Sequence, residues 1–204
     1  MTYGKLWGLD ELKKSGLNVP EYIVFELKNI TFIDYARYID KKLENFIIPS
    51  ENNDRIGVTI RVSFPEMIDK VGTHGGLHVI NKDEIIQQVI SKKQEYGDDV
   101  IIFIQHTVDA NCSGSIIKEK DRIIIETIPG DAPELLEGRT NDFEIWMKTI
   151  KWNNIRRHSS GEILNIKMIK NIEDMIMNFP NNSYFEWSIS KNGKIYFYEY
   201  LLLK

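Results

Sequence analysis

Hydrophobic residues recur along this chain with two periods, one typical of helices and one typical of strands. Spacings of three and four residues predict amphipathic helices over 32–46 and after Asn81, which caps the second of them. Strict alternation over 56–63 predicts a half-buried strand. The same criteria predict further helices at 6–17, 133–136 and 172–179, and further strands at 22–27, 100–105, 116–118, 122–128, 143–152, 184–190 and 195–203.

The alternating strand at 56–63 separates two kinds of side chain. Its aliphatic residues face one way and its polar residues face the other, the two sets being Ile56, Val58, Ile60 and Val62, and Thr59, Arg61 and Ser63. Strands and helices are mixed along the chain without strict alternation, and several strands follow one another directly. This order predicts an α+β fold with mostly antiparallel sheets and flanking helices.

Composition and charge narrow the function classes. The chain has 204 residues, of which 42% are hydrophobic and 27% charged, which is ordinary for a globular protein that buries a full core. A formal net charge of −4 disfavours nucleic acid as the main partner. The single cysteine, Cys112, excludes an intrachain disulfide. The start lacks the pattern of a signal peptide and no apolar run has the length of a membrane span, so we expect a cytoplasmic protein.

The strongest turn signal is the dipeptide Asn192-Gly193, between the last two predicted strands. A two-residue turn at this dipeptide sets Lys191 opposite Lys194. The same register sets Glu186 directly opposite Glu199, and opposed carboxylates repel each other.

Glu199 is also expected on an otherwise apolar face, together with Ile195, Phe197 and Leu201. A buried carboxylate pair either shifts one proton equilibrium or recruits a cation. Mg²⁺ is commonly held by one or two carboxylates together with substrate phosphates. An exposed edge hairpin would tolerate the same pair without a metal, so both interpretations stay open.

Six segments in chain order carry the motifs of one family. They are Tyr3-Gly4-Lys5-Leu6-Trp7-Gly8 with Val19-Pro20 after it, Ile60-Arg61-Val62-Ser63, Gly72 to Val79, Gln105-His106-Thr107-Val108 with Ser113-Gly114, Glu126 with Gly130 to Gly138, and Tyr184-Phe185-Glu186-Trp187 with Lys194-Ile195-Tyr196. In this order they resemble a shortened ATP-binding domain of the pyruvate phosphate dikinase and phosphoenolpyruvate synthase family. The resemblance spans nearly the whole chain.

The resemblance implies an ATP-grasp-like, two-lobed fold that sandwiches a nucleotide, with ATP and Mg²⁺ as cofactors. The N-terminal lobe would occupy 1–104 and carry the phosphate-binding strand and the glycine loop. The C-terminal lobe would occupy 105–204 and carry the metal-binding carboxylates. Lys5 and Arg61 would be the catalytic residues that contact phosphate. Their plainer alternatives are a solvated lysine and a surface arginine on a strand.

The remaining site residues follow from the same motifs. Loop residues Gly72, Thr73, Gly75 and Gly76 would approach the phosphates with their backbone, although an ordinary turn has the same composition. Residues Gln105, Thr107 and Val108 would line the adenine through main-chain hydrogen bonds, and their alternative is simply the end of a core strand. The metal ligands would be the carboxylates Glu126, Glu186 and Glu199, although Glu126 would also suit the surface end of a strand.

Two departures from the family pattern bear on activity. Leu201 stands where the family has an arginine, and Tyr184 stands where it has an acidic residue. The resemblance implies a phosphotransferase-type domain that passes phosphate to a small molecule or to a histidine of a separate partner protein. The family's phosphohistidine and pyruvate domains do not fit before Lys204, so a complete dikinase reaction is not expected here.

The departures favour an alternative, a catalytically inactive remnant that senses nucleotide or binds a partner. A third interpretation is a structural domain whose likeness is accidental. In that case Tyr196, Tyr198 and Tyr200, expected on one face, would form core or a partner surface. The sequence leaves the oligomeric state open.

Overall fold

A computed structural model describes residues 4–46, 48, 55–64, 77–130, 142–149, 153–157 and 162–203. The chain divides into two compact units, which are described separately below. The first unit comprises Met1–Trp7 and Pro20–Asp109, and the second comprises Gly8–Val19 and Ala110–Lys204. The division after 104 expected from the sequence falls within a strand that remains hydrogen-bonded into the first sheet as far as Val108.

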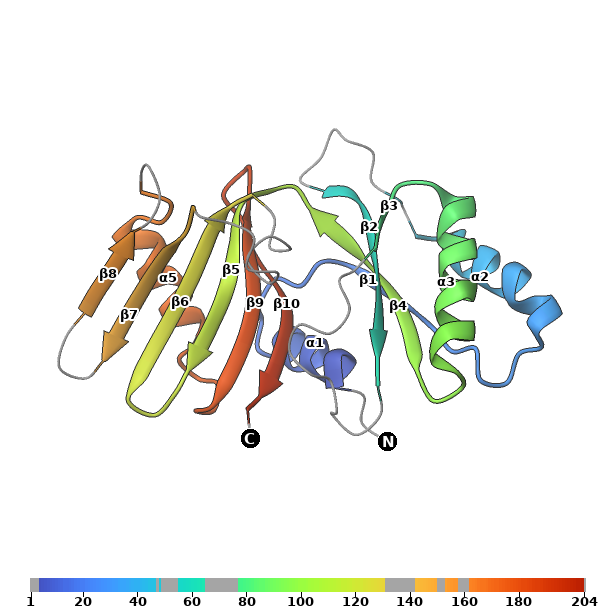
Figure 1. The fold of residues 1–204 in the computed structure, drawn as a ribbon, viewed down its shortest axis with the longest axis horizontal. Helices are drawn as coiled ribbons and strands as arrows, with labels where there is room; N and C mark the ends of the chain where they lie inside the picture. The colour runs from blue at the N-terminus through green and yellow to red at the C-terminus, as the bar shows by residue number, and fades with distance from the viewer. Residues whose placement is uncertain are drawn as a thin grey trace. The chain divides into compact units, whose positions relative to one another are not determined.

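The first unit is a four-stranded antiparallel sheet with helices on one face (Figure 1). Its strands lie in the order β1-β4-β2-β3, and the helices α2 and α3 contact each other. The elements are β1 Tyr22–Phe25, the 3-10 helix η1 Phe32–Asp34, α2 Tyr35–Leu43, β2 Arg55–Ser63, β3 Leu77–Val79, α3 Lys82–Tyr96 and β4 Ile101–Val108.

The core of the first unit forms where the apolar faces of its strands and helices meet. The alternation predicted for β2 is confirmed, because Val58, Ile60 and Val62 are buried and Thr59 and Arg61 are partly exposed. The helices contribute the buried residues Tyr35, Ile39, Leu43, Ile85 and Val89. The predicted cap of α3 is also present, since Asn81 Oδ1 accepts a hydrogen bond from the Asp83 backbone N–H at 2.8 Å.

The second unit is a six-stranded antiparallel sheet in the order β10-β9-β5-β6-β7-β8 (Figure 1). Helix α1, Gly4–Lys14, begins in the first unit and belongs to the second from Gly8 onward. The other elements are β5 Ala110–Lys118, β6 Arg122–Pro129, β7 Glu144–Thr149, β8 Asn153–Arg157, α5 Ile166–Ile176, β9 Ser183–Ser190 and β10 Ile195–Leu202.

One face of this sheet carries the aromatic core. The rings of Phe185 and Tyr200 stack with centroids 5.1 Å apart, and Phe179, just after α5, contacts both rings edge-on. Helix α5 lies on this side, because Glu173 forms an ion pair with Lys148 of β7. We call this side of the sheet the helix face. The opposite side carries the carboxylates discussed below.

Several elements differ from the sequence-based expectation. Strands β3 and β8 and the first half of β5 were not predicted, and α5 begins at Ile166 rather than at 172. Strand β7 is described over Glu144–Thr149, and the last predicted residues, 150–152, lie outside the described residues. The first half of β5 was missed because it contains the polar residues Asn111, Ser113 and Ser115, which are not typical of a strand. In the structure β5 pairs with β9 on one side and with β6 on the other, so it is a central strand. The helix expected at 133–136 lies outside the described residues.

The terminal hairpin reaches its predicted pairing by a different route. The predicted two-residue turn is wrong, because the Ser190 and Lys194 backbones pair, with Ser190 N–H donating to Lys194 O at 2.9 Å. The resulting three-residue loop places Gly193 at φ +86°, a conformation that favours glycine. A β-bulge between Phe197 and Glu199 then shifts the register, and Glu199 lies opposite Glu186 as predicted.

The bulge also changes which residues of β10 share a face. Ile195 and Phe197 pair with Ile189 and Trp187, whereas Glu199 pairs with Glu186 on the other side of the sheet. The expectation that Glu199 shares its face with Ile195 and Phe197 is therefore wrong. The predicted single face of three tyrosines is wrong as well, because Tyr196 pairs with Ser188 on one face and Tyr200 pairs with Phe185 on the other.

No helix within the described ranges is long and apolar enough to cross a membrane.

Candidate functional site

A row of polar residues crosses four neighbouring strands of the second unit. Glu199 of β10 lies opposite Glu186 of β9, which lies opposite Ser115 of β5, which lies opposite Glu126 of β6. Because directly paired residues share a face, all four side chains belong to the side opposite the helix face. We call this set the carboxylate row. It unites the three residues predicted as metal ligands.

Two side-chain hydrogen bonds position the carboxylates of the row. The Ser115 hydroxyl donates to Glu126 Oε2 at 3.0 Å, and the Tyr184 hydroxyl donates to Glu186 Oε1 at 3.3 Å. Glu199 and Glu186 are only 2% and 8% exposed, so the alternative of an exposed edge hairpin does not hold. The charges therefore lie close together with little access to water.

Tyr184 lies beside the carboxylate row on the same face of the sheet. Burial raises the pKa of its phenol above the ordinary value, and the negative charges of Glu186, Glu199 and Glu126 raise this pKa further. One hydroxyl group thus lies in the field of all three carboxylates. The tyrosine that replaces the family's acidic residue lies beside the row and donates to one of its members.

Glycine at position 114 allows β6 to approach β5 beside the row. A Cβ at this position would collide with the main-chain carbonyl oxygen of Glu126. The close approach sets the backbone from which the Glu126 side chain projects. The Ser113-Gly114 motif of the sequence therefore has a direct structural role next to the carboxylate row.

The donors of the carboxylate row suit a magnesium ion that also binds phosphate. Within the described ranges, no three His, Cys, Asp or Glu side chains are grouped closely enough to hold a metal ion by themselves. Mg²⁺ usually takes one or two carboxylates and completes its octahedron with water and phosphate oxygens. The opposed pair Glu186 and Glu199 can supply such a partial set, and Glu126 lies farther along the same row.

Leu201, the residue that replaces the family's arginine, also lies on the carboxylate side. It pairs with Tyr184 and is 6% exposed. An apolar side chain at this position offers no positive charge to a transferred phosphate. The sequence-level departure therefore falls beside the candidate metal ligands.

The first unit carries a second polar cluster, on the face of its sheet opposite the core helices. Arg61 Nη1 donates to Gln105 Oε1 at 3.2 Å, and the hydroxyls of Thr59 and Thr107 are hydrogen-bonded at 2.7 Å. We call these four residues the arginine cluster. Register pairs Thr59 directly with Gln105, so the cluster spans β2 and β4.

Lys5 lies near the same strand as Arg61. Its backbone N–H donates to Ser63 Oγ at 3.1 Å, and Ser63 follows Arg61 by two positions on β2. Ser63 therefore caps the start of α1 from a distant part of the sequence. Lys5 is 6% exposed, which contradicts the alternative of a solvated lysine. Its predicted contact with phosphate stays a prediction.

The segment predicted to line adenine lies within β4. The main chain of Gln105 is paired with Tyr22 and Thr59, and the His106 N–H donates to Glu21 O at 2.9 Å. Gln105 belongs to the arginine cluster with Thr107, while His106 and Val108 are buried with the core residues of the other face. The predicted loop residues Gly72, Thr73, Gly75 and Gly76 lie outside the described residues.

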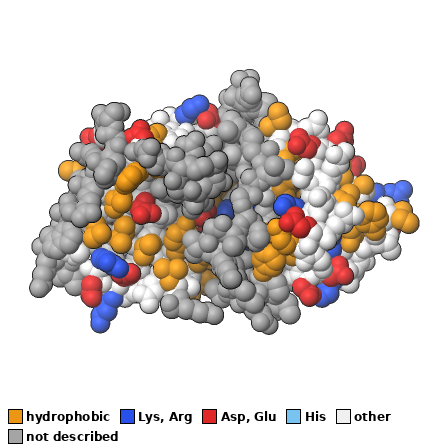
Figure 2. Space-filling model, in the orientation of Figure 1, with side chains coloured by type: hydrophobic (Ala, Val, Ile, Leu, Met, Phe, Trp, Pro, Cys, Tyr) orange, Lys and Arg blue, Asp and Glu red, His pale blue; other side chains and the backbone are white. Residues whose placement is uncertain are grey.

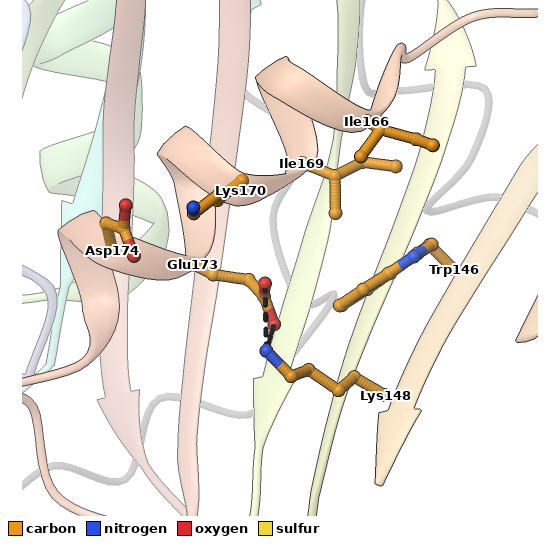
Figure 3. Close-up of a pocket in the computed structure, with 7 residues that line it drawn as sticks. All are labelled: Trp146, Lys148, Ile166, Ile169, Lys170, Glu173 and Asp174. Atoms are coloured by element: carbon orange, nitrogen blue, oxygen red, sulfur yellow. Dashed lines mark hydrogen bonds and ion pairs between the residues drawn. The ribbon is translucent and has the colours of Figure 1, made fainter. Parts of the chain in front are cut away.

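A cavity of about 370 Å³ lies between α5 and β7 on the helix face (Figure 3). Lys148 and Glu173 form an ion pair of 3.1 Å at its wall, beside Trp146. None of the residues predicted for the site lines it. The helical spacing of Ile166, Ile169, Lys170 and Glu173 is the sequence signal that would have indicated this wall.

The side of the second sheet opposite α5 is turned to the viewer in Figure 2. Where the described residues are visible on this side, hydrophobic side chains alternate with several acidic and basic ones.

Comparison with known proteins places the fold. No family model matches the chain, and no curated protein matches it. Solved structures that match include the phosphoribosylamine–glycine ligase from Thermotoga maritima, with a TM-score of 0.57 and 16% identity over 99% of this chain and 48% of that one. The D-alanine–D-serine ligase VanG from Enterococcus faecalis has a TM-score of 0.53 and 12% identity over 98% of this chain and 52% of that one.

The D-alanine–D-alanine ligase from Helicobacter pylori matches with a TM-score of 0.52 and 12% identity, covering 99% of this chain and 54% of that one. The chain thus spans about half the length of these structures. The likeness confirms the predicted α+β, ATP-grasp type of fold. These neighbours are ligases, so kinship with the dikinase and synthase family in particular stays a prediction.

Proposed function

We propose that this chain binds ATP together with Mg²⁺ and forms the nucleotide-binding part of an ATP-dependent ligase. The observation that carries this proposal is the carboxylate row, in which Glu199, Glu186 and Glu126 share one face of the second sheet. Buried carboxylates held opposite each other need a cation or a proton to offset their repulsion. Mg²⁺ bound to nucleotide phosphates supplies this charge.

Each cluster has a role in this proposal. Glu186 and Glu199 would hold the metal ion, with Glu126 in support, and the ion would neutralise negative charge on the phosphates. Arg61 and Lys5 would contact the phosphates directly. A guanidinium suits this task because its planar fork of donors matches phosphate oxygens.

The structural neighbours support both the nucleotide and the reaction class. The D-alanine–D-alanine ligase from Bacillus anthracis was solved in complex with ATP and matches 98% of this chain with a TM-score of 0.50 and 14% identity. An L-amino acid ligase from Bacillus licheniformis also matches 98% of this chain, with a TM-score of 0.53 and 12% identity. Phosphoryl transfer to a small molecule or to a partner histidine is the narrower form implied by the dikinase resemblance.

The Glu186→Gln variant tests the metal role. Its amide keeps the size of the side chain but removes one negative charge, so the Mg²⁺-dependent part of ATP affinity should fall at least tenfold by calorimetric titration. Glu162→Gln, an exposed change on the same unit, serves as the matched control. Unchanged Mg²⁺-dependent affinity in Glu186→Gln would remove the carboxylate row from the proposal.

A second candidate is nucleotide binding without turnover. Leu201 beside Tyr184 favours it, because this position lacks the positive charge that phosphoryl transfer uses. ADP formation measured with saturating ATP and Mg²⁺ separates the two candidates. Turnover that Arg61→Ala abolishes would support the ligase, and tight binding without ADP formation would support the second candidate.

A further inference from the structure

We propose that the side-chain amide of Gln105 is a ligand-binding donor, which together with the Arg61 guanidinium recognises a phosphate oxygen. The inference rests on the proposed function and extends it, because it assigns recognition to a side chain rather than to the main chain of β4. It concerns the first unit alone.

The orientation of the Gln105 amide is set by its neighbour. Arg61 Nη1 lies 3.2 Å from Gln105 Oε1, and a guanidinium can only donate hydrogen bonds. The end of the amide that faces Arg61 must therefore be the oxygen. This leaves the amide NH₂ group, Nε2, as the end that is not engaged by Arg61.

The Nε2 atom of Gln105 is buried, and no acceptor lies within hydrogen-bond reach of it in the described part of the chain. The residue as a whole is 2% exposed. Buried polar groups in native proteins are almost always hydrogen-bonded, and an exception calls for an explanation. A bound ligand that presents an oxygen to Nε2 provides one.

The surroundings indicate what kind of oxygen this is. Arg61 places a permanent positive charge beside the amide, and the hydroxyls of Thr59 and Thr107 lie on the same face. A cation flanked by neutral donors is the chemistry that binds an oxyanion such as phosphate. The main chain of Gln105 is less suited to binding an oxyanion, because it is paired with Tyr22 on one side and with Thr59 on the other.

The Gln105→Glu variant separates a ligand-binding role from a structural one. A glutamate keeps an oxygen to accept from Arg61, but it has no NH₂ donor and adds a negative charge. The thermal midpoint should therefore be kept, while the affinities for MgATP and for inorganic tripolyphosphate should both fall at least tenfold. Gln87→Glu on the exposed face of α3 is the matched control for the added charge.

Each outcome of these titrations has a distinct meaning. If Gln105→Glu binds both anions within twofold of wild type, the amide is structural and the inference is overturned. If wild type binds tripolyphosphate but not ATP, and the variant loses tripolyphosphate, the inference stands and the proposed function fails. If wild type binds neither anion, both fail. Should Gln105→Glu not fold, as judged by circular dichroism, Gln105→Met carries the same expectation for the two anions.

Discussion

Lys118 holds the end of helix α5 against the central strand β5, and its removal should destabilise the second unit. Its ammonium donates to three main-chain carbonyls at the end of the helix, those of Ile176 at 3.2 Å, Met177 at 2.6 Å and Phe179 at 2.5 Å. The side chain is 7% exposed. A cation at this position satisfies carbonyls that the helix itself leaves unpaired and opposes the helix dipole.

The Lys118→Met variant keeps most of the apolar stem and removes all three donors. A hydrogen bond from a charged donor contributes about 1.5–3 kcal/mol, and carbonyls left buried without a donor cost about 1–3 kcal/mol each. Desolvation of the ammonium offsets part of this, as the lowered pKa of Lys118 shows. We expect a net loss of about 2–4 kcal/mol in the free energy of unfolding.

Urea denaturation followed by far-ultraviolet circular dichroism measures this loss, with Lys120→Met as the exposed control two positions away. Because the folded pKa of Lys118 is lowered, the unfolded chain binds more protons between the folded value and 10.5. The free energy of unfolding should therefore rise with pH across that interval in wild type but not in Lys118→Met. A loss below about 0.5 kcal/mol, the range of neutral surface changes, would refute the capping argument.

Two further outcomes follow from burial and close approach. Gly114→Ala would drive a methyl group into the Glu126 carbonyl, so we expect a loss of about 1–3 kcal/mol in urea denaturation together with weaker Mg²⁺-dependent ATP binding. Full stability in this variant would contradict the close approach of β5 and β6. Burial raises the pKa of the Cys112 thiol to about 11 from its usual 9.0, so alkylation of the folded protein at pH 8 should be about 100-fold slower than alkylation of the denatured chain. Equal rates would mean that this thiol is accessible.

The terminal hairpin has features that the sequence predicts and features that it does not. The pairing of β9 with β10 was predictable, because strands joined by a short loop usually pair with each other. The loop length and the bulge after Phe197 were not, since both depend on how β10 packs rather than on local preference. The two differences shift the register in opposite directions, so the predicted pair survived while the predicted faces did not.

The rest of the carboxylate row depended on contacts between distant segments. Glu126 joins the row because β9 pairs with β5, and no local signal relates these two strands. The tight packing at Gly114 is likewise explained only by the neighbouring strand. For the same reason the burial of Lys5 against Ser63, 58 positions along the chain, could not be read from the spacing of hydrophobic residues.

The arginine cluster was predictable only in part. Alternation along β2 placed Arg61 and Thr59 on one face, and the structure confirms this arrangement. The partnership of Arg61 with the Gln105 side chain required the register between β2 and β4, which a sequence does not specify. Sequence reasoning therefore assigned the segment of Gln105 to main-chain contacts and missed its amide.

We propose that the chain binds ATP through a magnesium ion held by the carboxylate row. The most direct measurement is the thermal midpoint of the wild-type protein with ATP, with and without Mg²⁺, compared with that of Glu186→Gln. Ligand at a hundredfold excess over its dissociation constant adds about 2.7 kcal/mol of stability. We predict a raised midpoint that needs Mg²⁺ in wild type and is lost in Glu186→Gln. No shift in wild type, or the same shift in both proteins, would contradict metal-dependent ATP binding at the carboxylate row.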